Sequence, residues 1–268
     1  MSTDFEAHMD AEDEEAGGEM TLLEHLAELR RRVVYSFIAV AVGFGVSWTW
    51  VEDLFTFILV PLEAAAPEAG MGQINYKDLT EPFFTLIKTA IIAGVFLAIP
   101  VILYQIWKFV APGLYKHERR LALPFVAIAS AFFFVGASFC YYFVMPYGFE
   151  FLFKFSQGVD ANPTLMMSEH YNLAIKLLLA FGIVFEMPVA AMFLSAVGVI
   201  THRTLIEYWR ISVVVAFIFA AMLTPPDIGT QLAMAIPLIV LYGISIGVAY
   251  VFTTRRERRD EAIMDELG

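Results

Sequence analysis

Six long apolar stretches constrain the fold of this chain more than any other feature of its sequence. Helices of about 20 apolar residues cross a bilayer core that is roughly 30 Å thick. Residues 209–223 reach only about 22 Å at a rise of about 1.5 Å per residue, so this stretch needs a locally thinner bilayer or cover from its neighbours. The sequence predicts an all-α polytopic membrane protein with six transmembrane helices, at residues 33–51, 83–109, 121–145, 173–199, 209–223 and 232–252.

The composition agrees with a membrane protein and excludes a soluble domain. Hydrophobic residues make up 59% of the 268 residues and charged residues only 17%, against about 25% charged residues in soluble domains. Most of the 17 Lys and Arg residues lie before the first stretch, between the second and third, between the fourth and fifth, and after the sixth. The opposite loops carry only Lys77 and Lys154. Because positive charge marks cytoplasmic loops, we expect both termini in the cytoplasm.

The remaining segments divide the chain simply. We expect residues 1–19 to form a disordered acidic tail, residues 20–252 the membrane domain, and residues 253–268 a cytoplasmic tail. The two long outer loops contain an apolar piece at 54–62 and an aromatic piece at 147–155. We expect both pieces to lie along the membrane interface as caps.

Motifs of catalysis and cofactor binding are absent from the sequence. It has no phosphate-binding loop, no dinucleotide fingerprint and no HExxH zinc motif, and no serine nucleophile elbow. The five histidines are not spaced as metal ligands. We therefore predict a protein that is not an enzyme and that binds no metal, no cofactor and no nucleic acid.

A short amphipathic stretch at residues 21–32 leads into the first apolar segment. One apolar stripe on this helix consists of Leu22, Leu26, Leu29 and Val33. Glu28 falls well away from the stripe, whereas Arg30 lies roughly 60° from its centre at about 100° per residue. We therefore expect Arg30 to lean toward whatever this helix packs on and to lock the helix onto the bundle.

A second charged cluster follows the second apolar stretch, in the run Tyr-Lys-His-Glu-Arg-Arg at 115–120. Its acid, Glu118, lies among three cations, and a solvated ion pair of little energy is one interpretation. In the other interpretation, Glu118 and Glu28 lie at the same cytoplasmic face and hold guanidinium groups through paired, charge-assisted hydrogen bonds. Phe109 flanks the turn before this run on the same face.

One acid, Glu186, lies deep in the fourth apolar stretch. A carboxylate at the bilayer centre costs about 2.5–3.5 kcal/mol on insertion scales, so such residues are usually functional. Glu186 is either a neutral acid that satisfies backbone left without a donor by Pro188, or a polar contact for a partner helix or substrate. With Lys88, it also leaves open a proton-coupled transporter of small solutes, although no internal repeat supports one. Asp227 is most simply a cap of the sixth helix.

Five segments together resemble TatC, the multi-span receptor subunit of the twin-arginine protein translocase. They are residues 24–32, 100–107, 115–120, 181–188 and 223–227, within a resemblance that covers roughly residues 20–256. The resemblance implies a concave cup of six helices in the cytoplasmic membrane that recognises signal peptides with consecutive arginines. It also implies the export of folded proteins with the single-span partners TatA and TatB, in a complex of several copies driven by the proton-motive force.

The resemblance further implies a role for four residues at the cytoplasmic face. Glu118 and Glu28 match the acids that bind the signal-peptide arginines. Arg30 matches a functionally important basic position in the N-terminal motif, and Phe109 an aromatic residue at the same site.

Three more positions match the family elsewhere in the chain. Glu186 matches the intramembrane acid on the concave face that contacts partner helices, and Pro61 and Asp227 match outer positions that shape the cap. The long acidic tail at 1–19 departs from the family pattern.

Overall fold

The computed structural model describes residues 22–65, 75–110, 122–156, 166–223 and 228–267. Within these ranges every regular element is a helix, and an isolated bridge joins Asn75 to Met166. The elements in chain order are α2 (Leu22–Trp48), α3 (Val51–Ala65), α4 (Glu81–Val110), α5 (Ala122–Phe139), a π-helical turn (Cys140–Val144), α6 (Met145–Ser156), α7 (Met167–Val184), α8 (Met187–Val197), α9 (His202–Glu207), α10 (Trp209–Leu223) and α11 (Ile228–Leu267).

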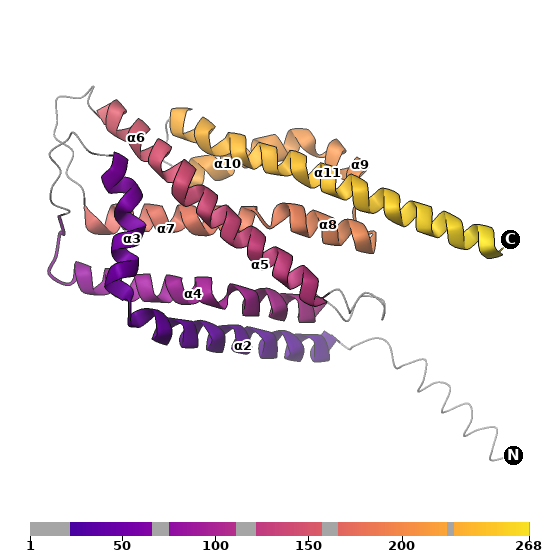
Figure 1. Cartoon of the computed structure of the whole chain (residues 1–268), viewed down its shortest axis with the longest axis horizontal. Helices are drawn as coiled ribbons and strands as arrows, with labels where there is room; N and C mark the ends of the chain where they lie inside the picture. Colours follow the sequence, from indigo (N-terminus) through magenta and orange to yellow (C-terminus); the bar gives the residue numbers. More distant parts are fainter. Residues whose placement is uncertain (1–21, 66–74, 111–121, 157–165, 224–227, 268) are drawn as a thin grey trace, which may run out of the picture.

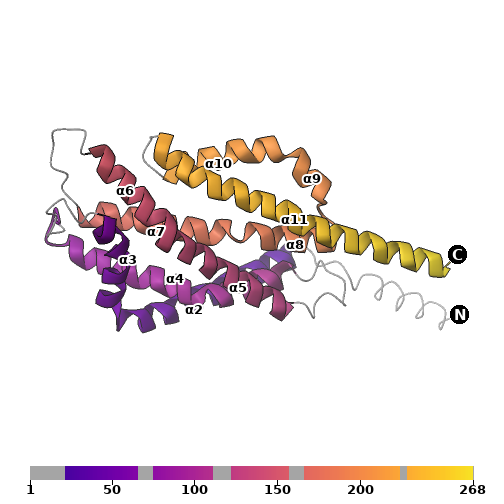
Figure 2. The same ribbon diagram turned by 45° about the horizontal axis from the view of Figure 1, so that its top comes forward.

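The long helices run roughly along one axis of the molecule, and α3 lies across them near one end (Figure 1). α2 packs along α4, and α11 packs on α8. α5 continues through the π-helical turn into α6 and crosses the other helices obliquely (Figure 2). At the end opposite α3 lie the start of α2, the end of α4, the start of α5 and the C-terminal part of α11.

Four helical stretches are long and apolar enough to cross a membrane, namely Glu81–Val110, Leu123–Lys154, Met167–Val197 and Ile228–Arg258. A further crossing forms if α2 and α3 count as one broken span, whose halves meet at 89°. α10 is an apolar helix of 15 residues, at the bounds predicted for the short fifth span. The protein is a helical, multi-pass membrane protein, while the count of six spans and the cytoplasmic location of both termini stay predictions.

Large apolar side chains cover much of the outer surface. Phe37 is 70% exposed, Val42 63% and Ile183 64%. Exposing such side chains to water costs about 25 cal/mol per Å² of apolar surface, whereas lipid tails solvate them freely. Since apolar burial does not drive helices together in lipid, close packing of small residues has to do so.

The contact between α2 and α4 follows this rule. Small residues recur at every fourth position around it, Ala39, Gly43 and Ser47 on α2 and Ala90, Gly94 and Ala98 on α4. A Cβ atom on Gly43 would lie 2.6 Å from the carbonyl oxygen of Gly94, and one on Gly94 would lie 2.5 Å from the backbone nitrogen of Phe44. The two backbones therefore touch, which is the approach that a small-xxx-small pattern permits.

The segment predicted as the fourth span is two helices. α7 ends at Val184 and α8 begins at Met187, so Phe185 and Glu186 lie in the break. Pro188 has no backbone N–H to continue the hydrogen-bond ladder of α7, and its ring crowds the preceding turn. The ladder resumes where the N–H of Ala190 donates to the carbonyl of Glu186 at 2.8 Å. The kink expected from Pro188 is thus a two-residue interruption within the single long stretch Met167–Val197.

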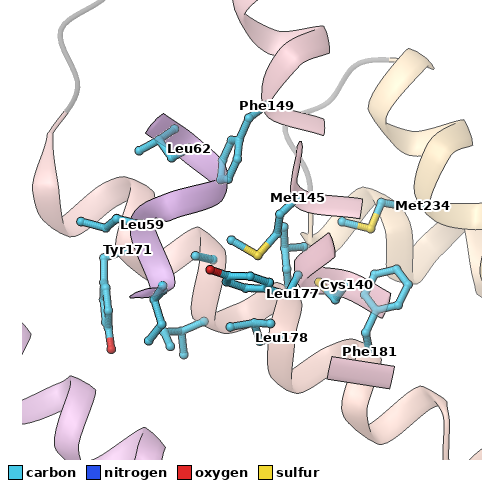
Figure 3. Close-up of a cluster of buried hydrophobic side chains, with 14 of the residues drawn as sticks. Leu59, Leu62, Cys140, Met145, Phe149, Tyr171, Leu177, Leu178, Phe181 and Met234 are labelled. Carbon is cyan, nitrogen blue, oxygen red and sulfur yellow. The ribbon is translucent and has the colours of Figure 1, made fainter. Parts of the chain in front are cut away.

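The largest hydrophobic core lies beneath α3, where it meets α6, α7 and the π-helical turn. Figure 3 shows its side chains gathered among these helices, with Leu59 of α3 among them. The hydroxyl of Tyr141, in the π-helical turn, donates to the backbone carbonyl of Phe57 at 2.6 Å, and the two rings stack at 4.5 Å. The apolar piece predicted to form a cap is therefore α3, and Tyr141 fastens it to the helices below.

Polar contacts tie together the loop before α4 and the start of α7. The carboxylate of Glu81 accepts hydrogen bonds from the backbone N–H groups of Lys77 at 2.6 Å and Ser168 at 2.8 Å. The ammonium group of Lys77 forms an ion pair with Glu169, which raises the pKa of Lys77 above its usual value. These contacts close the end of the bundle that carries α3.

Candidate functional site

The charged end of the contact between α2 and α4, which we call the α2–α4 seam, holds an ion pair. The Nη2 atom of Arg32 donates to Oε1 of Glu28 at 2.6 Å, one helical turn away on α2. The Nη1 atom of the same guanidinium donates to Oε1 of Gln105 on α4 at 3.3 Å. The side chains of Glu28 and Arg32 are only 16% and 19% exposed. Oε2 of Glu28 is buried and has no hydrogen-bond partner among the described residues.

An aromatic stack lies beside this pair on the same two helices. The imidazole of His25 stacks on the ring of Phe109, with centroids 4.3 Å apart and planes at 25°. His25 precedes Glu28 by about one turn of α2, and Phe109 follows Gln105 by about one turn of α4. The seam thus carries a polar contact and, next to it, an aromatic one.

A groove of about 370 Å³ opens along the seam. Arg32 and Gln105 line its polar part, and Phe109 lies at its end. Apolar side chains from both helices, Leu29, Val33, Phe37, Val40, Ile102 and Ile106, form the rest of its wall together with Ser36. The groove can therefore take an apolar ligand. Among the described residues that line it, the charged one is Arg32, and the Glu28 carboxylate lies outside this lining.

The C-terminal end of α4 is held in place by Trp107. This buried indole packs against Phe125 of α5 at 4.5 Å and against Phe193 of α8 at 4.8 Å. On the same turn, the ammonium group of Lys108 lies 4.6 Å from the ring centre of Tyr104. Trp107 thereby fixes the orientation of Phe109 and Gln105 relative to α5 and α8.

The orientation predicted for Arg30 is wrong. Its side chain is exposed, and the guanidinium that contacts α4 belongs to Arg32. The reason is that α2 does not pack through the centre of its apolar stripe, where Leu26 is 60% exposed. The face of α2 that packs on α4 lies further around the helix, toward Glu28 and Arg32. Small and polar residues make this contact with α4, so the apolar stripe can face lipid.

The other predicted residues are spread over the molecule. Glu186 lies in the break between α7 and α8, half-buried, and its Oε1 has no hydrogen-bond partner among the described residues. Pro61 is buried within α3, at the opposite end from the α2–α4 seam. Glu118 and Asp227 lie outside the described residues. Of the predicted residues, the structure brings Glu28 and Phe109 together on the seam.

Sequence reasoning missed two residues of the seam, Arg32 and Gln105. The spacing of four residues between Glu28 and Arg32 is a pattern that favours an ion pair on a helix, so it could have identified Arg32. The small residues every fourth position, Gly43 and Gly94 among them, could have identified the face on which α2 packs. In the described parts of the chain, no group of three or more His, Cys, Asp or Glu side chains is arranged to hold a metal.

The chain is similar to known proteins in both sequence and structure. The family model of the Sec-independent protein translocase protein (TatC) matches residues 24–237. The chain belongs to the TatC family. The resemblance stated from the sequence is confirmed, and with it a non-enzymatic component of a protein translocase. Nothing in the comparisons supports a small-solute transporter.

Individual TatC proteins match along nearly the whole chain. The protein from Desulforapulum autotrophicum is 45% identical over 240 residues, which are 89% of this chain and 87% of that protein. The protein from Aquifex aeolicus is 38% identical over 245 residues, 91% of this chain and 100% of that protein. A crystal structure of the twin-arginine translocase receptor TatC is similar with a TM-score of 0.76 at 38% identity, over 86% of this chain and 100% of that chain.

Proposed function

We propose that this TatC-family protein recognises twin-arginine signal peptides at the α2–α4 seam, on the cytoplasmic face of the membrane. The observation that carries the proposal is the half-buried carboxylate of Glu28. It already holds one guanidinium group, and its second oxygen meets no donor within the described parts of the chain. The solved structure that the chain resembles is described as a twin-arginine translocase receptor, which supports the same role here.

The chemistry of the seam suits consecutive arginines followed by an apolar segment. A carboxylate and a guanidinium form charge-assisted hydrogen bonds that are roughly twice as strong as neutral ones. Glu28 supplies one such carboxylate, and we propose that Glu118 supplies the second, so that each arginine of the pair meets one acid. Phe109 offers a ring face on which a guanidinium can stack, and the apolar wall of the groove accepts the segment that follows.

The remaining steps of export need other subunits. We propose that TatA and TatB join this protein in a complex of several copies, and that the proton-motive force drives the passage of folded proteins. Glu186 lies between α7 and α8, and its Oε1 has no partner among the residues that the structure describes. It is the proposed polar contact for a partner helix. Pro61 within α3, together with Asp227, is proposed to shape the outer cap.

Photo-crosslinking tests the receptor role directly. A photoreactive amino acid replaces Glu118 in the full-length protein, and a second version replaces Lys154, a lysine at the other end of the bundle. Position 118 is expected to label a signal peptide with an arginine pair strongly, to label the lysine-paired version of that peptide weakly, and position 154 to label neither. Equal labelling of the two peptides at position 118, or labelling of neither, would refute the proposal.

A further inference from the structure

The hydrogen bonding of the Glu28 carboxylate is incomplete. Oε1 accepts from Arg32, while Oε2 is buried and has no partner among the described residues. In native proteins the large majority of buried polar atoms have at least one partner, so an exception needs an explanation. Glu28 thus has the capacity to accept one more hydrogen bond from a donor that enters the seam.

Arg32 holds the Glu28 carboxylate in place. Its guanidinium donates through Nη2 to Glu28 and through Nη1 to Gln105, so it joins α2 to α4. A guanidinium is a rigid planar fork, whereas the ammonium group of lysine is a point charge on a flexible chain. The fork therefore anchors Oε1 of Glu28 at a defined place relative to both helices.

We propose that Arg32, braced by Gln105, is a positioning residue of the signal-peptide site, which holds Glu28 so that Oε2 receives the guanidinium of a peptide arginine. This inference rests on the proposed function. A carboxylate anchored through one oxygen presents its other oxygen to a planar guanidinium donor with less freedom, while an unanchored one accepts arginine and lysine alike. The His25–Phe109 stack lies about one turn away on the same two helices, so its aromatic rings neighbour the proposed arginine position.

A pair of matched variants tests the role of Arg32. Arg32→Met removes the fork, and Arg31→Met is the control because Arg31 is the next residue, carries the same charge and bonds the hydroxyl of Tyr35 on its own helix at 3.1 Å. The assay measures the Kd of an arginine-paired and a lysine-paired signal peptide for the full-length protein in detergent. Arg32→Met is expected to weaken binding of the arginine-paired peptide by about tenfold or more relative to Arg31→Met, since the partner of a desolvated charge is lost.

The preference for arginine over lysine separates positioning from mere structural support. The ratio of the Kd values of the lysine-paired and arginine-paired peptides is expected to fall toward one in Arg32→Met. A general loss of structure would weaken the binding of both peptides equally and leave this ratio unchanged. Arg32→Lys is expected to recover affinity but not the preference, because an ammonium cannot span Glu28 and Gln105 in the same way. In a Glu28→Gln background, Arg32→Met is expected to change nothing further, because Arg32 acts through Glu28.

The outcomes distinguish this inference from the proposed function. If the unaltered protein prefers arginine and Glu28→Gln removes that preference, but Arg32→Met behaves like Arg31→Met, the positioning role is wrong and the receptor role stands. If the unaltered protein shows no preference, the receptor role itself is wrong. Should Arg32→Met fail to fold, Gln105→Leu removes the brace alone and is expected to reduce the preference. An unchanged preference in that variant would overturn the inference.

Discussion

Replacing Gly43 by alanine should destabilise the protein, although the same change two residues away should not. A Cβ atom at position 43 would lie 2.6 Å from the carbonyl oxygen and 2.9 Å from the Cα atom of Gly94. Both are backbone atoms that cannot rotate away, so α2 and α4 have to move apart. Gly45 is on the same helix, and a Cβ atom there meets nothing within 4 Å.

The pair of variants isolates the cost of this contact. Both gain the helix propensity of alanine over glycine, about 1 kcal/mol in an exposed helix interior, so the gain cancels in the comparison. Overpacking a well-packed contact costs about 1–3 kcal/mol, and Gly43→Ala should be less stable than Gly45→Ala by this amount. Thermal unfolding of the two variants in the same detergent measures the difference. Equal melting temperatures would show that the helices do not meet through their backbones.

Two further predictions concern the end of the bundle that carries α3. Tyr141→Phe removes the hydrogen bond to the carbonyl of Phe57 and should lower the free energy of unfolding by about 0.5–1.5 kcal/mol. Amide hydrogen exchange in α3 should become faster in this variant, and unchanged exchange would contradict the prediction. Because Glu169 raises the pKa of Lys77, their ion pair should stabilise the fold fully from neutral pH up to about pH 10.4. The effect should be lost as the pH rises through the higher folded value of Lys77, and also in acid, where Glu169 is protonated. The difference in melting temperature between the unaltered protein and Lys77→Gln should therefore stay constant from neutral pH and narrow only in strong base; narrowing at neutral pH would contradict this.

The helical, membrane-spanning character of the fold could be predicted because the apolar stretches depend only on composition and length. The short helix α10, Trp209–Leu223, has the bounds that its apolar stretch predicts. The π-helical turn at Cys140–Val144 could not be predicted, because no local sequence pattern marks it; the turn carries Tyr141, whose hydroxyl bonds the carbonyl of Phe57 on α3. The interruption at Glu186 could be predicted as a kink, because Pro188 removes a hydrogen bond from the ladder of α7.

The candidate site was predictable in part. Glu28 could be selected because a carboxylate in an amphipathic lead-in to a membrane span is unusual, and the family resemblance supplied its role. The basic residue beside it could not be predicted from the apolar stripe of α2, because Arg32, and not Arg30, contacts Glu28 and α4. In lipid the stripe need not pack on protein, and small residues such as Gly43 decide which face meets α4. The face of α2 that meets α4 therefore carries Arg32, while Arg30 is exposed.

The central claim is that paired carboxylates on the cytoplasmic face distinguish consecutive arginines from consecutive lysines. Equilibrium binding of arginine-paired and lysine-paired signal peptides to the full-length protein and to its Glu118→Gln variant tests it most directly. We expect the unaltered protein to bind the arginine pair at least about tenfold more tightly, equivalent to about 1.4 kcal/mol, and the variant to lose this advantage. Equal binding of the two peptides, or an advantage that survives in the variant, would contradict it.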